Sequence, residues 1–128
     1  MTARKLIVAA TACLIALSSA SAMAAGDVKN GKKVFNKCKA CHTIKKGDKH
    51  KIGPNLSGVI GRKAGTASGF TKYSESMKGS GIVWSEATLE EFLTKPKAMV
   101  KKTKMGFAGL KKASQRADVI AYIQNASK

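Results

Sequence analysis

The chain has 128 residues and a formal net charge of +17, with 24 basic side chains against 7 acidic ones. This length allows one compact domain of about a hundred residues behind a short N-terminal segment, and it excludes a second domain of ordinary size. Because 21 of the 24 basic residues are lysines, the charge indicates nonspecific attraction to an acidic surface and not the bidentate arginine contacts by which proteins read bases.

Residues 1–24 have the pattern of a cleavable secretory signal peptide. Arg4 and Lys5 precede an almost unbroken apolar stretch, residues 6–17, and small residues of the A-x-A type follow it. The stretch is shorter than the roughly 20 residues that a membrane-spanning helix needs, so we expect cleavage and not an anchor. We therefore expect a periplasmic protein, secreted through the inner membrane, whose mature domain covers residues 25–128.

The mature chain would carry a net charge of +15, because removal of Arg4 and Lys5 leaves 22 basic and 7 acidic residues. Cys13 is lost with the leader, so two cysteines, Cys38 and Cys41, remain. In an oxidising compartment these two would enclose too short a loop for a useful structural disulfide. We therefore expect them to be attachment points for a cofactor.

The first helix of the domain is expected to begin after Asp27, which is a suitable N-cap. Apolar or small residues then recur at spacings of three and four, which places them on one helical face. They are Val28, Gly31, Val34, Phe35 and Cys38. Residues 44–71, by contrast, contain six glycines and no sustained periodicity, so we expect a long functional loop there.

Three further helical segments are expected in the second half of the domain. A short turn over residues 74–78 ends at a glycine, and Ser85 is the N-cap of a helix that Pro96 ends. The last helix covers about residues 112–125. The apolar residues of the two longer helices are Leu89, Phe92, Leu93, Val119, Ile120, Tyr122 and Ile123.

The first and last helices are expected to cross at Gly31, where the absence of a side chain permits a close approach. Phe35 would then contact Val119 and Tyr122 in the core. These patterns predict a single all-α domain.

The run Cys38-Lys39-Ala40-Cys41-His42 is typical of the attachment site of a c-type haem. Two cysteines three positions apart can each bind a haem vinyl group through sulfur, and the following histidine lies beneath the iron as an axial ligand. A structural zinc site would need His50 as its fourth ligand, and adjacent Cys41 and His42 could hardly close one tetrahedron. A thioredoxin-like dithiol would need an apolar strand before the motif, and none precedes it. Haem attachment is the favoured interpretation, with these two as its alternatives.

Several motifs fall in the order seen in one family. The chain resembles mitochondrial-type class I cytochromes c and the bacterial cytochromes c2 over essentially all of its mature length. The motifs are the Cys38 to His42 run, Gly53-Pro54-Asn55-Leu56, Gly61-Arg62-Lys63, Trp84, Thr103-Lys104-Met105 and Phe107-Ala108-Gly109. The resemblance implies the class I cytochrome c fold, in which the helices pack around one covalently bound haem c.

The resemblance also implies a ligand set for the iron. Met105 matches the sulfur ligand opposite His42, and such a His/Met pair raises the reduction potential relative to His/His. The other methionines are weaker candidates, because two leave with the leader, Met77 lies in a turn and Met99 matches an apolar position. Pro54 matches the residue whose carbonyl accepts a hydrogen bond from the second ring nitrogen of the histidine.

Four residues match positions around the haem propionates: Arg62, Tyr73, Trp84 and Thr103. Buried carboxylates need such hydrogen-bond partners. Two of them have a simpler alternative, since Trp84 could be an ordinary core aromatic residue and Arg62 could lie in solvent. The loop that carries Tyr73 also contains an extra residue.

Two departures from the family pattern concern the surroundings of Met105. Phe92 stands where a tyrosine is common, so a polar contact near the sulfur should be missing. Lys101-Lys102 replaces Pro-Gly, which removes a stiff turn before the ligand. We hypothesise that Met105 is exchanged for a lysine of this loop as the pH rises, with Lys97, Lys101, Lys102 and Lys104 as candidates.

The resemblance and a fully ligated iron both indicate a soluble one-electron carrier and not an enzyme, because no coordination position stays open for a substrate. Expected partners are acidic redox proteins such as a cytochrome bc complex and a reaction centre, oxidase or reductase, with no specific nucleic acid. We expect a monomer that can associate peripherally with an anionic membrane. Lysines expected around the exposed haem edge are Lys33, Lys37, Lys39, Lys97, Lys104, Lys111 and Lys112.

Two other functions stay open at this point. A haem-based peroxidase or sensor would need an axial ligand that is easily displaced. A cationic protein that binds membranes or nucleic acid would need no haem at all.

Overall fold

A computed structural model describes residues 25–128, so the expected signal peptide lies outside the described residues. Helices in this part are α1 (Val28–Val34), the short 3-10 helix η1 (Phe35–Lys37), α2 (Glu75–Lys78), α3 (Glu86–Thr94), α4 (Pro96–Met99) and α5 (Ala113–Ala126). The described residues contain no strand beyond an isolated antiparallel bridge between Lys63 and Val83. The all-α prediction is thus confirmed. None of these helices is long and apolar enough to cross a membrane.

Helix α1 begins where its N-cap was expected. The side chain of Asp27 accepts a hydrogen bond from the backbone N–H of Asn30 at 2.8 Å, which satisfies one of the free donors at the helix start. The backbone N–H of Asp27 donates to the carboxylate of Asp118 in α5 at 2.7 Å. The start of the domain is therefore fixed to its last helix.

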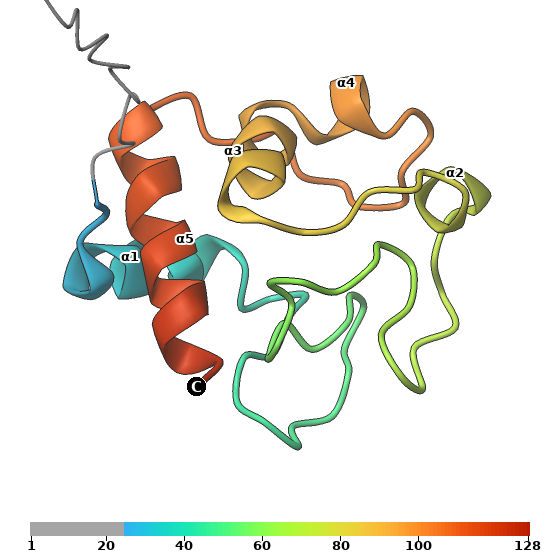
Figure 1. Cartoon of the computed structure of the whole chain (residues 1–128), viewed down its shortest axis with the longest axis horizontal. Helices are drawn as coiled ribbons and strands as arrows, with labels where there is room; N and C mark the ends of the chain where they lie inside the picture. Colours follow the sequence, from blue (N-terminus) through green and yellow to red (C-terminus); the bar gives the residue numbers. More distant parts are fainter. Residues whose placement is uncertain (1–24) are drawn as a thin grey trace, which may run out of the picture.

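Helices α1 and α5 cross closely at Gly31, as the sequence predicted (Figure 1). A Cβ atom at Gly31 would lie 1.9 Å from the carbonyl oxygen of Asp118, so no other residue fits there without moving a helix. One turn further on, Phe35 is 1% exposed and its ring centroid lies 5.3 Å from that of Tyr122. This contact sets the position of the chain that enters the cysteine motif.

Helix α3 packs beside α5 and begins with a capping box. Ser85 and Thr88 each accept a hydrogen bond from the other's backbone N–H. The helix ends at Thr94, before the extended Lys95 that a following proline favours. Pro96 then starts the additional helix α4, which the sequence analysis missed, because proline suits the first position of a helix as well as the end of one.

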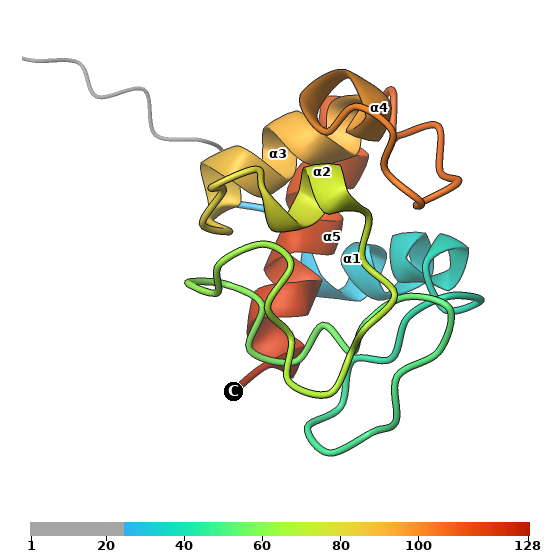
Figure 2. The same cartoon turned by 90° about the vertical axis from the view of Figure 1, so that its right-hand side faces the viewer.

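Residues 38–74 contain no helix longer than a turn and form the irregular half of the molecule (Figure 2). The expected long loop is therefore confirmed. Buried Asn55 holds it together: its amide donates to the carbonyl oxygens of Lys45 and Asp48, and its side-chain oxygen accepts from the backbone of Ser57. Side-chain hydrogen bonds of this kind replace the missing secondary structure.

Candidate functional site

The cysteine motif forms a hydrogen-bonded turn at the end of η1. The backbone N–H of Cys38 donates to Phe35 at 2.8 Å, and the N–H groups of Cys41 and His42 donate to the carbonyl of Cys38 at 3.1 and 2.9 Å. Both cysteines are free thiols and half-buried. Because Phe35 is buried under α5, the core fixes the place of this turn and of the three side chains on it.

His42 is oriented by the loop that follows it. Its Nδ1 lies 2.8 Å from the carbonyl oxygen of Pro54, and this is the contact that the family resemblance implied. A carbonyl can only accept, so Nδ1 carries the hydrogen and Nε2 keeps a free lone pair. Burial lowers the pKa of His42, and the Pro54 carbonyl opposes that shift without reversing it. The imidazole is therefore neutral at neutral pH, which is the form that binds a metal.

Gly53 lets the backbone pass directly against the His42 ring. A Cβ atom at this position would lie 2.4 Å from Cε1 of His42 and 2.9 Å from its Nε2. The backbone N–H of Gly53 also donates to the carbonyl of Cys41 at 2.7 Å. The imidazole thus has a tight backbone wall on one side and a hydrogen bond that sets its tautomer.

The donor set at this turn fits a haem c. Two free thiols and an imidazole with an available Nε2 come from one short segment, which is what two thioether bonds and one axial ligand require. Burial, with a smaller effect of Cys41, raises the pKa of the Cys38 thiol to about 11, so this thiol is protonated at neutral pH. The zinc alternative lacks its fourth ligand, because both ring nitrogens of His50 are occupied by Ser68 and Asn55.

Arg62 and Trp84 are brought together by backbone pairing. The N–H of Trp84 donates to the carbonyl of Arg62 at 3.0 Å, and that of Gly61 donates to Trp84 at 2.7 Å. The guanidinium of Arg62 is half-buried and donates to the carbonyls of Asn55 and Ser57, so it does not lie free in solvent. Trp84 is buried.

Tyr73, Phe92 and Thr103 lie on three separate segments. The hydroxyl of Tyr73 accepts a hydrogen bond from the backbone of Ala67 at 3.1 Å. Phe92 is buried, with its ring centroid 5.0 Å from that of Trp84, and it has no polar group to offer. Thr103 lies in the segment that carries Met105 and accepts a hydrogen bond from the backbone N–H of Met105 at 3.3 Å.

Met105 is half-buried at the edge of the hydrophobic core. Lys102, three residues earlier, has φ +59 and is the single non-glycine residue with positive φ among residues 25–128. Glycine adopts this left-handed conformation freely, whereas a lysine is strained there by about 1 to 2 kcal/mol. The turn therefore has a backbone conformation that suits glycine, although the residue in it is a lysine.

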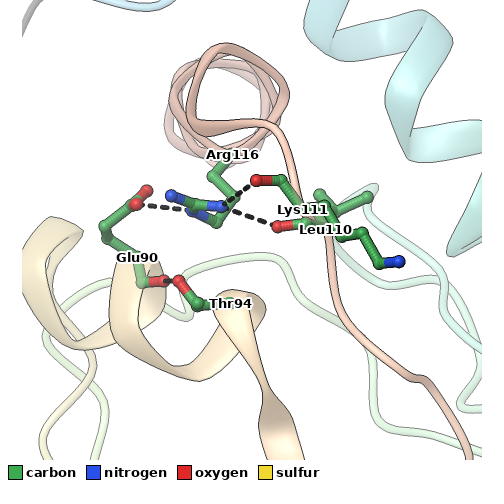
Figure 3. Close-up of polar contacts among 5 residues, drawn as sticks. All are labelled: Glu90, Thr94, Leu110, Lys111 and Arg116. Atoms are coloured by element: carbon green, nitrogen blue, oxygen red, sulfur yellow. Dashed lines mark hydrogen bonds and ion pairs between the residues drawn. The ribbon is translucent and has the colours of Figure 1, made fainter.

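Three features of the site were missed by sequence reasoning: the Gly53 contact with His42, the His50 hydrogen bonds, and Arg116. Arg116 in α5 binds Glu90 of α3 and the carbonyls of Leu110 and Lys111, as Figure 3 shows. One signal was available, since Arg62 and Arg116 are the only arginines among 22 basic residues of the described chain. Each binds several carbonyls, which the ammonium group of lysine does less well.

Comparison with known proteins places these features in a family. The cytochrome c family matches residues 28–127. Cytochrome c2 of Rhodomicrobium vannielii is 51% identical over 105 residues, which are 82% of this chain and 83% of the relative. Cytochrome c of Sesamum indicum is 48% identical over 103 residues, which are 80% of this chain and 92% of the relative. Cytochrome c-550 of Nitrobacter winogradskyi is 48% identical over 103 residues, 80% of this chain and 94% of the relative.

Proposed function

Because this chain belongs to the cytochrome c family and therefore carries electrons on one covalently attached haem c, we propose that residues 38–42 and Met105 hold that haem. Cys38 and Cys41 form the two thioether bonds, in which each S–H adds across a vinyl double bond. His42, through Nε2, and Met105, through sulfur, would bind the iron. The observation that carries this assignment is the 2.8 Å contact between His42 Nδ1 and Pro54, which leaves Nε2 free.

Bound haem c supplies one iron centre that accepts a single electron from a reduced partner and gives it to an oxidised one. The protein keeps His42 in one tautomer and Met105 at the edge of the core, so both would offer neutral donors to the iron. With no position open to a substrate, the chain is an electron carrier and not an enzyme. Fixed ligands also keep the structural change between the two oxidation states small.

Arg62, Tyr73, Trp84 and Thr103 are proposed to surround the haem propionates. The backbone pairing of Arg62 with Trp84 supports this, because it brings two residues with N–H donors in their side chains onto adjoining backbone segments. Tyr73 supports it less directly, since its hydroxyl oxygen accepts from Ala67 and its proton is left for another acceptor. Buried carboxylates are stable only with such donors.

The partners of the chain are redox proteins. We propose that they present acidic surfaces, with a cytochrome bc complex as donor and a reaction centre, oxidase or reductase as acceptor. Exposed lysines support this, because they flank both the cysteine turn and the segment of Met105: Lys33, Lys37, Lys39, Lys97, Lys104, Lys111 and Lys112. We further propose a periplasmic monomer, residues 25–128 after loss of the leader, that binds anionic membranes peripherally.

An optical and electrophoretic experiment tests the haem assignment. Wild-type protein should keep its haem through denaturing electrophoresis, and a Cys38→Ala/Cys41→Ala variant should lose it. Met105→Ala should abolish the sulfur-to-iron charge-transfer band of the ferric protein while the haem stays attached. A double-cysteine variant that retains denaturation-resistant haem contradicts the attachment site.

Salt dependence tests the docking surface. Electron transfer with an acidic redox partner should slow as ionic strength rises, because the screening length falls to about 10 Å near 0.1 M. Lys37→Glu and Lys104→Glu should slow it more than Lys128→Glu, which serves as the control at the exposed C-terminus. Stopped-flow rates that are equal for all three variants contradict the lysine ring.

A further inference from the structure

The segment that carries Met105 is held mainly at its two ends. Within the described residues, the backbone of residues 104–109 makes no backbone–backbone hydrogen bond. Its one hydrogen bond joins the N–H of Met105 to the Thr103 side chain at 3.3 Å, which is a long contact. The position of the sulfur therefore depends on the packing of Met105 and Phe107 against the core and on the two anchors at either end of the segment.

The first anchor, on the N-terminal side, is a turn in which Thr103 donates to the carbonyl of Val100 at 3.2 Å. This turn contains Lys102 in the left-handed conformation, so it carries backbone strain. Strain makes alternative conformations of the turn less costly relative to the native one. The first anchor is therefore the weaker of the two.

The second anchor, on the C-terminal side, is built from several contacts. Gly109 lies against α3, where a Cβ atom would be 2.3 Å from the carbonyl of Thr94. Leu110 is 2% exposed, and its N–H donates to the carbonyl of Leu93 at 2.7 Å. Nη1 of Arg116 donates to the carbonyl of Leu110 at 2.7 Å and to that of Lys111 at 3.1 Å (Figure 3).

Arg116 is itself held in place by Glu90. Its Nε donates to the Glu90 carboxylate, and the two side chains are only 12% and 25% exposed. Helix stability does not explain an arginine at this place, because a positive charge near the N-terminus of α5 opposes the helix dipole. The arginine instead joins α3, α5 and the C-terminal end of the segment that carries Met105 through one rigid guanidinium.

We propose that Arg116, held by Glu90, is a positioning residue for Met105: it fixes the C-terminal end of the segment and so keeps the sulfur opposite His42. The proposal rests on the assignment of Met105 as an axial ligand. A thioether binds ferric iron weakly, so small changes in the freedom of its segment alter how readily an added ligand replaces it. Loss of the Arg116 contacts therefore weakens sulfur ligation before it unfolds the protein.

The test is an imidazole titration of the ferric holoprotein, followed by loss of the sulfur-to-iron charge-transfer band. Arg116→Gln should lower the dissociation constant of imidazole about tenfold, the factor that corresponds to about 1.4 kcal/mol. Arg116→Lys keeps the positive charge beside Glu90 but lacks the forked donors of the guanidinium. Its imidazole dissociation constant should therefore lie between those of Arg116→Gln and the wild type. The reduction potential of Arg116→Gln should fall, because a looser thioether favours the ferrous state less.

Gln124→Ala is the matched control. Nε2 of Gln124 donates to Glu86 and so also joins α5 to α3, but the side chain makes no hydrogen bond to residues 100–112 of the described chain. This variant should leave the dissociation constant of imidazole unchanged, even if it lowers the free energy of unfolding measured in denaturant. An equal effect of Gln124→Ala and Arg116→Gln overturns the proposal, and so does an unchanged constant in Arg116→Gln.

Failure of the ligand assignment can be told apart from failure of the positioning role. If Met105→Ala keeps the charge-transfer band, Met105 is not the ligand, and both the assignment and the positioning role fall. If Met105→Ala loses the band and Arg116→Gln behaves as wild type, only the positioning role falls. Should Arg116→Gln not fold, Glu90→Ala, which removes the acceptor that holds the Arg116 guanidinium, replaces it. An unchanged imidazole constant there also overturns the proposal.

Discussion

The segments that carry His42 and Met105 are held in different ways. Around His42, side chains bind the backbone at many points: Asn55 bonds to Lys45, Asp48 and Ser57, and His50 bonds to Asn55 and Ser68. Around Met105, one long hydrogen bond lies between two anchors. Hydrogen bonds thus hold the loop that carries His42 along its length, whereas the segment that carries Met105 is held mainly at its two ends.

This difference matters for an electron carrier, because His42 and Met105, its two proposed ligands, need different protection. The imidazole is a strong ligand in a covalently attached segment, and its loop adds a set tautomer. The thioether is a weak ligand, so its retention depends on the protein around it. Substitutions on the histidine side should therefore alter folding, and those on the methionine side should alter ligand exchange.

The largest effect is expected for Gly53→Ala. A Cβ atom at 2.4 Å from Cε1 of His42 cannot be accommodated unless the ring or the backbone moves. We expect the free energy of unfolding to fall by about 3 kcal/mol, together with loss of the native ferric spectrum. Gly106→Ala, beside Met105, is the control, because no atom lies within 4 Å of its added Cβ. Denaturant unfolding that gives equal values for the two variants contradicts this asymmetry.

An intermediate effect is expected for His50→Ala. The substitution removes a hydrogen bond of 2.9 Å from Asn55 and one of 2.8 Å to Ser68, which join two parts of the irregular half. The free energy of unfolding should fall by about 1 to 3 kcal/mol, and the imidazole constant of the ferric protein should stay unchanged. A clear change in the imidazole dissociation constant, in a variant as stable as the wild type, would show that the segments of His42 and Met105 are coupled. That result would contradict the difference between the two segments.

The smallest effect is expected for Lys102→Gly. Relief of the left-handed strain outweighs the added backbone freedom of glycine, so unfolding should cost about 0.5 to 1 kcal/mol more. The ferric charge-transfer band should also persist to higher pH, because the turn before Met105 opens less readily. Lys101→Gly, where φ is not positive, should instead lower stability. Lys101→Gly and Lys102→Gly are compared by the pH at which the ferric charge-transfer band is lost. If both variants shift this pH equally, strain at Lys102 does not cause the shift.

The hypothesis that a loop lysine replaces Met105 at high pH stays a prediction. Lys97, Lys101, Lys102 and Lys104 are all exposed, so none is held away from the segment by burial. A pH titration of single Lys→Ala variants would identify the replacing residue by the loss of the high-pH spectrum.

Much of the fold and the proposed attachment site could be predicted from the sequence because their signals are local. Asp27 and Ser85 cap the helices that follow them within three residues, and Cys38, Cys41 and His42 form one turn. Gly31 marked a helix crossing because only a residue without a side chain permits one that close. Pro96 can either end one helix or begin the next, so its meaning was ambiguous. Helix α4 was not predicted for that reason.

Only the tertiary structure decided the contacts between segments that are far apart along the chain. No local pattern announces that His50 binds Ser68, or that Arg116 of α5 meets Glu90 of α3. The positive φ of Lys102 is likewise imposed by the anchors on either side of it, since lysine alone disfavours that conformation. The sequence by itself pointed to Cys38, Cys41 and His42 as the proposed attachment site, because these residues are neighbours along the chain. How firmly each ligand is held depends on packing and hydrogen bonds that form only when distant segments come together.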